Sequence, residues 1–445
     1  MKLTIIGGGS VRTPRLIPSL VRRAARLGLL ELWLMDTDPQ RLELIGGMCR
    51  RQVEQLDAGF RVFTSTDARA AITDASHVIT SIRPGLEAGR ATDERIAFGL
   101  AVLGQETTGA AGFAMAMRSA PPILEYARLV DRLASPGAWL FNFTNPAGLV
   151  AQVLHDAGMT RVVGICDSAN KARNEVSRFL GIPQDRLRHD VYGLNHLSWT
   201  RSVRVDEGTN GGMEELLPAL LGDDQFVQAT HLKMFAKGLR AAEGVFLNEY
   251  LHYYYHRDEA LAHLLRESET RGEQVQRLTQ ELLLKLGSAG DVDGQLAIWR
   301  EVMDQRSKSY MAHARDGAAR ESRQPVGEDD EGYAAVALGC VEAIARNELT
   351  WTGLNVPNGD AISGLDADDV VEVSCRVDGG GAEPLPVGDI PDRHLDLMRS
   401  VKVYERLASR AILQRSRSLA LQALCAHPLL GSWPLAEKLF DAFHR

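Results

Sequence analysis

The chain has 445 residues, which is enough for two or three domains that each bury a core of their own. Its net charge is −8 with acidic and basic residues interspersed, which argues against a nucleic-acid partner or an anionic membrane surface and leaves small-molecule chemistry open. The five cysteines form no CxxC pair, so we expect a reducing, cytoplasmic environment without disulfides. We find no secretory signal, and no apolar run approaches the roughly 18 residues of a membrane span.

The N-terminus has the order of a nucleotide-binding βαβ unit. Residues 2–6 are a β-branched apolar run, a glycine cluster follows, and apolar residues then recur at helical spacing. A plain tight turn explains the glycines alone equally well. A second strand at 31–35 ends in Asp36, whose carboxylate can accept hydrogen bonds from a ribose and disfavours a 2′-phosphate, so we predict NAD rather than NADP. The predicted phosphate-cradling residues are Gly7, Gly8, Gly9 and Ser10.

Three further strand-like runs, at 77–82, 138–141 and 161–165, continue the alternation of strands and helices. This alternation predicts a doubly wound, Rossmann-like parallel sheet. The strand at 138–141 leads into the sequence NFTNP at 142–146, where Asn142 and Asn145 can meet a ribose, a nicotinamide or sugar hydroxyls, or can merely stabilise the turn.

After residue 196 the pattern changes. An antiparallel strand at 197–204 is followed by a long, mostly helical region, a late strand at 370–377 and an amphipathic helix pattern from 399 to 425. We therefore predict an α/β protein in which residues 1–190 form an NAD-binding domain. Residues 191–445 are expected to form an α+β, mostly helical domain for catalysis and oligomerisation.

The candidate reaction centre is Cys166 together with His196, about thirty positions later. Each follows a short apolar run, and a thiolate and an imidazole can bind one divalent metal between them if the fold brings them together. Either residue alone is more often a buried core side chain.

Six short motifs stand in one order along the chain: IIGGGS at 5–10, GQET at 104–107, NFTNP at 142–146, GIC at 164–166, GLNH at 193–196 and YL at 250–251. In this set and order the chain resembles, nearly end to end, the NAD-dependent family 4 glycosidases, and within them the 6-phospho-β-glucosidases. That family departs from the two-carboxylate mechanism of glycoside hydrolysis.

The resemblance implies that Cys166 and His196 ligate a divalent metal, usually Mn²⁺, and that Tyr250 is the catalytic base. It implies that Arg90, Asn145 and Arg271 contact a phosphorylated disaccharide or aryl glucoside, and guanidinium groups suit a phosphate. Glu106 is expected to support the metal site or a sugar hydroxyl. The implied reaction is oxidation at C3 by NAD, removal of the C2 proton, elimination of the C1 group, addition of water and return of the hydride. A homodimer or homotetramer is also implied.

Two positions depart from the β-type pattern. Asp167 stands where β-specific members carry Asn and where α-specific members carry Asp as a proposed general acid, so the anomer stays open and Asp167 is a candidate catalytic residue. The acidic run at 328–331 stands where the family has a glycine-rich turn, and four acids near the site would repel a phosphate.

The alternatives are a 6-phospho-α-glucosidase, another α-glycosidase, and two functions of other classes. A dehydrogenase of the lactate or malate type would form stoichiometric NADH and need no thiol or metal. A redox-sensing nucleotide-binding protein would leave the tyrosine and arginines without a role. A Cys166→Ser change distinguishes these hypotheses. It should abolish the metal-dependent activity of a glycosidase but leave a dehydrogenase or a nucleotide-binding protein largely intact.

Overall fold

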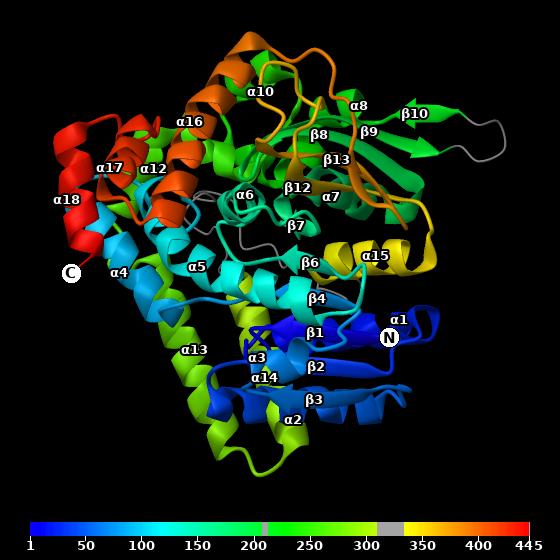
Figure 1. Cartoon of the computed structure of the whole chain (residues 1–445). Helices are drawn as coiled ribbons and strands as arrows, with labels where there is room; N and C mark the ends of the chain where they lie inside the picture. Colours follow the sequence, from blue (N-terminus) through cyan, green and yellow to red (C-terminus); the bar gives the residue numbers. More distant parts are fainter. Residues whose placement is uncertain (207–211, 309–332, 445) are drawn as a thin grey trace.

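The computed structural model of the chain describes residues 1–206, 212–308 and 333–444. The acidic run at 328–331 therefore lies outside the described residues. Within those residues a large sheet with its connecting helices lies beside a smaller antiparallel sheet, and the C-terminal helices pack beside α4 and α5 (Figure 1). Among the helices described, none is both long enough and apolar enough to cross a membrane.

The large sheet contains nine of the described strands in the order β14-β13-β12-β7-β6-β4-β1-β2-β3. The six strands from β3 to β7 are parallel, and their order reverses at β1, as in a doubly wound fold. These parallel strands are β1 (Lys2–Ile6), β2 (Glu31–Met35), β3 (Arg61–Ser65), β4 (His77–Thr80), β6 (Trp139–Asn142) and β7 (Val162–Gly164).

Helices connect successive parallel strands. The connecting helices are α1 (Leu16–Leu27), α2 (Pro39–Gln55), α3 (Ala68–Ile72), α4 (Leu86–Gly99), α5 (Gly109–Leu133) and α6 (Ala147–Asp156), with the short strand β5 (Gly104–Gln105) before α5 and the 3₁₀ turn η1 (Thr13–Arg15) before α1. The start of α2 shows why a helix begins there: Asp38 accepts hydrogen bonds from the backbone N–H of Gln40 and Arg41, and Pro39 occupies the first helical position.

The predicted doubly wound sheet is confirmed, and the structure adds strands that the sequence pattern did not reveal. The strand β3 is one of them. Three antiparallel strands also extend the sheet beyond β7: β12 (Thr350–Pro357) and β14 (Gly381–Pro384) are likewise new, and β13 (Val370–Asp378) confirms the late strand predicted at 370–377. The sheet thus includes residues from both sides of the predicted domain boundary at 190/191.

The second sheet is antiparallel and consists of β8 (Leu187–Leu194), β9 (Leu197–Asp206), β10 (Met213–Glu215) and β11 (Phe246–Leu247). The register of the first two strands pairs Leu194 with Leu197, so Asn195 and His196 form a two-residue hairpin loop. His196 has a backbone φ of 63°, a left-handed conformation that is uncommon for a side-chain-bearing residue and often marks a functional site.

The remaining elements are mostly helical, as predicted. They are α7 (Lys171–Leu180), α8 (Leu217–Leu221), α9 (Asp224–Ala229), α10 (Lys237–Glu243), α11 (His252–Tyr255), α12 (Arg257–Leu264), α13 (Arg271–Ser288), α14 (Val292–Lys308), α15 (Tyr333–Arg346), α16 (Asp392–Gln414), α17 (Arg417–Ala426) and α18 (Trp433–Phe443), with 3₁₀ turns η2 (Ser168–Asn170), η3 (Gln184–Arg186), η4 (His231–Met234) and η5 (Glu249–Leu251). The single helix expected from 399 to 425 is wrong. Arg415 adopts a left-handed conformation that ends α16, and Ser416 caps α17.

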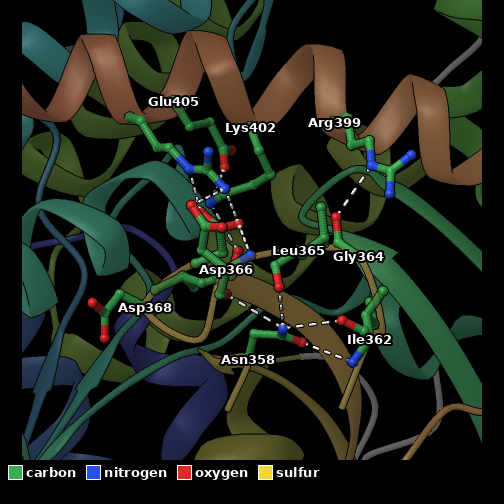
Figure 2. Close-up of polar contacts among 12 residues, drawn as sticks. Asn358, Ile362, Gly364, Leu365, Asp366, Asp368, Arg399, Lys402 and Glu405 are labelled. Carbon is green, nitrogen blue, oxygen red and sulfur yellow. Dashed lines mark hydrogen bonds and ion pairs between the residues drawn. The ribbon is translucent and has the colours of Figure 1, made fainter. Parts of the chain in front are cut away.

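Polar contacts within the connection between β12 and β13, and from this region to α16, hold it in place. The Asn358 amide donates to the carbonyl of Ile362 at 3.1 Å, and Arg399 Nε donates to the carbonyl of Gly364 at 3.1 Å (Figure 2). The buried Lys402 ammonium donates to the carbonyl of Val370 at 3.0 Å and to Glu405 at 2.7 Å. These bonds fix the start of β13, the strand that carries a buried carboxyl beneath the candidate site.

Candidate active site

A cavity of about 760 Å³ lies at the carboxyl ends of the parallel strands. Its walls include residues that directly follow β1, β2, β4, β6 and β7, which is where ligands bind in doubly wound sheets. Twelve of the residues singled out in the sequence line it: Gly7, Gly9, Ser10, Asp36, Arg90, Glu106, Asn145, Cys166, Asp167, His196, Tyr250 and Arg271. Segments that are far apart in the chain thus meet in one cavity.

At one end of the cavity the glycine turn leaves no room for side chains at positions 7 and 8. Gly7 has a φ of 93°, and a Cβ on Gly8 would lie 2.7 Å from Leu34 Cβ. The backbone N–H of Gly9 donates to Asp36 Oδ2 at 2.9 Å. A glycine turn and one carboxylate therefore lie together at the ends of β1 and β2, which is where doubly wound sheets bind a nucleotide.

Gly8 and Asn142 do not line the cavity. Asn142 is fully buried, and its Oδ1 accepts hydrogen bonds from Thr80 Oγ1 at 3.0 Å and from the Thr144 backbone N–H at 3.2 Å. The Asn142 side chain thus holds the turn after β6, while Asn145 on the same turn lines the cavity.

At the other end, the Sγ atom of Cys166 lies 3.2 Å from His196 Nε2. Burial raises the pKa of the Cys166 thiol and lowers the pKa of His196 to about 4, so the pair is neutral when no cation is bound. Sulfur and imidazole nitrogen are both donors for divalent metals, and a metal would release the thiol proton. The residues that the structure describes contain no cluster of three or more His, Cys, Asp or Glu side chains around a metal position. The pair would therefore leave coordination positions for a ligand.

Two candidate catalytic groups flank this pair. The ring of Tyr250 stacks on His196 with 3.7 Å between centroids and 6° between planes. Asp167 follows Cys166 directly, and burial raises its pKa to about 6 even though Arg12 and Lys171 act in the opposite direction. A carboxyl of this kind exists in both protonation states near neutral pH and can transfer a proton.

Buried ion pairs hold the cavity wall beside Cys166 and His196. Arg90 donates from Nε to Glu94 at 2.7 Å and from Nη1 to Glu106 at 2.5 Å, and Arg83 also pairs with Glu106. Burial alone would raise the pKa of Glu106, but Arg83 and Arg90 outweigh it and hold that pKa at about 2. Glu106 therefore fixes two guanidinium groups in the cavity wall.

Several residues of the site were not singled out in the sequence. Thr107 Oγ1 contacts His196 Nδ1 at 2.6 Å, and Lys171 Nζ pairs with the buried carboxylate of Glu249 at 3.3 Å. Glu372 on β13 is buried near Cys166. Thr107 lies within the GQET motif, and Lys171 lies one helical turn after Asp167, so both could have been found from local sequence. The signal for Glu372 is weaker: it is a lone acid inside the apolar run at 370–377.

Comparisons with known proteins find matches over most of the chain. Residues 2–182 match the model of the family 4 glycosyl hydrolases, and residues 191–430 match the model of the C-terminal domain of the same family. A probable 6-phospho-β-glucosidase of Bacillus subtilis is 31% identical over 99% of this chain and 95% of its own length.

Two solved structures are similar over almost the whole chain. The 6-phospho-β-glucosidase of Thermotoga maritima with manganese, NAD⁺ and glucose-6-phosphate has a TM-score of 0.83 at 26% identity, covering 100% of this chain and 97% of that one. A 6-phospho-α-glucosidase from gut microorganisms with NAD and Mn²⁺ has a TM-score of 0.79 at 25% identity, covering 99% of this chain and 97% of that one.

Proposed function

This chain belongs to the family 4 glycosyl hydrolases, and on that premise we propose that it hydrolyses 6-phospho-β-glucosides with the help of NAD and Mn²⁺. The observation that carries the proposal is the approach of Cys166 Sγ to His196 Nε2, at 3.2 Å, in the cavity that also contains the glycine turn. A nucleotide site and a metal-ligand pair in one cavity fit an enzyme that oxidises and re-reduces its own substrate.

The residues present fit both cofactors. The backbone of residues 7–10 and the Asp36 carboxylate would hold NAD, and Cys166 with His196 would hold the metal. The thiol and imidazole alone would also suit zinc, and the manganese-containing structure of the Thermotoga maritima relative favours Mn²⁺. When bound, NAD supplies a hydride acceptor for C3 of the sugar and the metal supplies a Lewis acid for the neighbouring oxygens.

Tyr250 takes the C2 proton in this proposal. Its ring is held parallel to that of His196, which keeps Tyr250 beside the metal-ligand pair. Asp167, with a pKa of about 6, gives a proton to the departing C1 oxygen. Asn145 and Arg271 bind the phosphorylated sugar, and Arg90 shapes the same wall through its bonds to Glu94 and Glu106.

A second candidate is a 6-phospho-α-glucosidase. The observation that favours it is the identity of residue 167, because the resemblance implies Asp as a general acid at this position in the α-type members and Asn in the β-type members. The similarity to the 6-phospho-α-glucosidase from gut microorganisms supports this candidate almost as strongly as the similarity to the β-type structure supports the first.

The test is release of p-nitrophenol from the α and β anomers of p-nitrophenyl glucoside 6-phosphate, with NAD and Mn²⁺ each omitted in turn. We expect turnover of the β anomer that needs both additions and disappears in the Cys166→Ser variant. Turnover of the α anomer instead would support the second candidate. Turnover without NAD or metal, or equal turnover by Cys166→Ser, would contradict both. The unphosphorylated anomers serve as the control for the role of the 6-phosphate.

We also propose a homodimer or homotetramer in the cytoplasm. Light scattering on the eluting protein would test the assembly, and cell fractionation would test the location.

A further inference from the structure

The side chain of Thr107 contacts two polar groups at short distance. Its Oγ1 lies 2.6 Å from His196 Nδ1 and 2.7 Å from Gln105 Oε1. The backbone N–H of Thr107 also donates to Gln105 Oε1, at 2.6 Å. The three groups form a continuous path from Gln105 through Thr107 to the far side of the imidazole from Cys166.

Only one arrangement of protons satisfies all of these contacts. A backbone N–H can only donate, so the Gln105 atom that receives it must be the carbonyl oxygen and not the NH₂ group. That oxygen cannot donate, so the Thr107 hydroxyl must use its single proton toward Gln105. The hydroxyl oxygen is then left as an acceptor, and His196 Nδ1 must carry the proton that it receives.

This arrangement determines the state of the other ring nitrogen. With the proton on Nδ1, the lone pair of His196 lies on Nε2, the nitrogen that faces Cys166 Sγ at 3.2 Å. Nε2 can thus ligate a metal through its lone pair without any change of tautomer.

The backbone around Gln105 and Thr107 is held in place by neighbouring segments. Gly104 bridges to Gly109 and Gln105 bridges to Thr108, which makes a tight hairpin of residues 104–109. A Cβ on Gly112 would lie 2.7 Å from the Thr107 carbonyl carbon, so the first turn of α5 abuts this backbone. Glu106, between Gln105 and Thr107, pairs with arginines instead of His196.

We propose that Gln105 and Thr107 form a hydrogen-bond relay that sets the tautomer and orientation of His196, which makes Thr107 a positioning residue for metal binding. This inference rests on the proposed function for the role of Cys166 and His196. Tyr250 fixes the plane of the imidazole by stacking, and the relay selects which nitrogen faces the metal.

Thr107→Val and Thr107→Ser form the matched pair that tests the relay, because valine keeps the shape and loses the hydroxyl while serine keeps the hydroxyl. We expect Thr107→Val to weaken Mn²⁺ binding, measured by electron paramagnetic resonance of the free ion, by about 10- to 100-fold. Thr107→Ser should retain most of the affinity, and NAD binding should be unchanged in both. Equal Mn²⁺ affinity in wild type and Thr107→Val would overturn the proposal.

The tautomer gives a readout that does not depend on activity or on metal. In the metal-free protein, above the pKa of free imidazole, ¹⁵N NMR of labelled histidine should place the His196 proton on Nδ1, with His196→Gln assigning the signal. Gln105→Met is the second variant: without the acceptor, the Thr107 hydroxyl turns its proton toward Nδ1, and the ring proton should move to Nε2. A proton that stays on Nδ1 in Gln105→Met would contradict the relay.

Failure of the relay and failure of the proposed function can be distinguished. If Cys166→Ser binds Mn²⁺ as tightly as wild type, the metal site is elsewhere and the proposed function fails, while the NMR comparison still decides the tautomer. If Cys166→Ser loses Mn²⁺ but Thr107→Val does not, the proposed function stands and the relay is refuted.

Discussion

The two ends of the cavity are built in different ways. The nucleotide end uses the backbone of residues 7–10 and one carboxylate, Asp36, from the next strand. The reaction end combines four distant segments: Cys166 after β7, His196 in the β8–β9 hairpin, Thr107 before α5 and Tyr250 in η5. A nucleotide site can therefore be recognised within one short stretch of sequence, whereas the reaction site exists only after the fold has formed.

The two ends also differ in electrostatics. The nucleotide end is a buried glycine turn whose backbone N–H groups are bonded to Met35, Asp36 and Gly7, and the reaction end contains buried carboxyl groups at positions 106, 249 and 372. Each of these is compensated by a cation or by hydrogen-bond donors, since an unpaired buried charge is costly. We therefore expect changes at the reaction end to reduce the stability of the whole fold, and changes at the nucleotide end to reduce mainly ligand affinity.

The largest loss of stability is expected from Glu106→Leu. The substitution leaves the Arg83 and Arg90 guanidinium groups without the carboxylate that joins them, and removing one partner of a buried ion pair costs about 3–5 kcal/mol. Urea denaturation followed by circular dichroism measures this change in the free energy of unfolding. Glu348→Leu, which removes an exposed carboxylate that also pairs with two arginines, is the control and should cost far less. Similar losses of unfolding free energy in the two variants would contradict the expected electrostatic difference between the two ends of the cavity.

The next largest effect is a change of the free energy of unfolding with pH, and it is caused by Glu372. Burial raises its pKa to about 7, although Ser198, Asn195 and Asn355 donate hydrogen bonds to it. The folded state therefore keeps a proton that the unfolded chain releases near its ordinary pKa of about 4.3, so the free energy of unfolding should fall as pH rises from about 4 to 7. The total is on the order of 3 kcal/mol for one group.

The Glu372→Gln variant isolates the contribution of this one carboxyl to the pH dependence of the free energy of unfolding. Glutamine cannot titrate, and it can still accept bonds from Asn195 and Asn355. The free energy of unfolding, measured by urea denaturation across this pH range, should fall more steeply in wild type than in the variant. Parallel pH profiles for the two proteins would mean that the Glu372 carboxyl does not keep its proton in the folded state.

The contrast between the ends also explains what could be predicted from the sequence. The glycine turn and Asp36 could be predicted because each lies at a strand end that is evident locally. Asn142 and Asn145 look alike in sequence, and only burial separates the turn-forming side chain from the one that lines the cavity. The strands β12–β14 were not assigned to the large sheet because the pairing of Asn355 with Gly164 joins residues nearly two hundred positions apart.

The smallest effect, at the nucleotide end, separates ligand affinity from stability. In Gly9→Ala the new Cβ would lie 2.9 Å from Asp36 Oδ2, the end of a side chain that can rotate away, so we expect little loss of stability. The bond from the Gly9 N–H to Asp36 would be lost, and NAD affinity, measured by calorimetry, should fall by about tenfold. Gly47→Ala is the control: its Cβ meets nothing within 4 Å, so it should leave NAD binding unchanged and stabilise α2 by about 0.5–1 kcal/mol. A Gly9→Ala variant that unfolds more readily but binds NAD normally would show that this turn serves the fold and not the ligand.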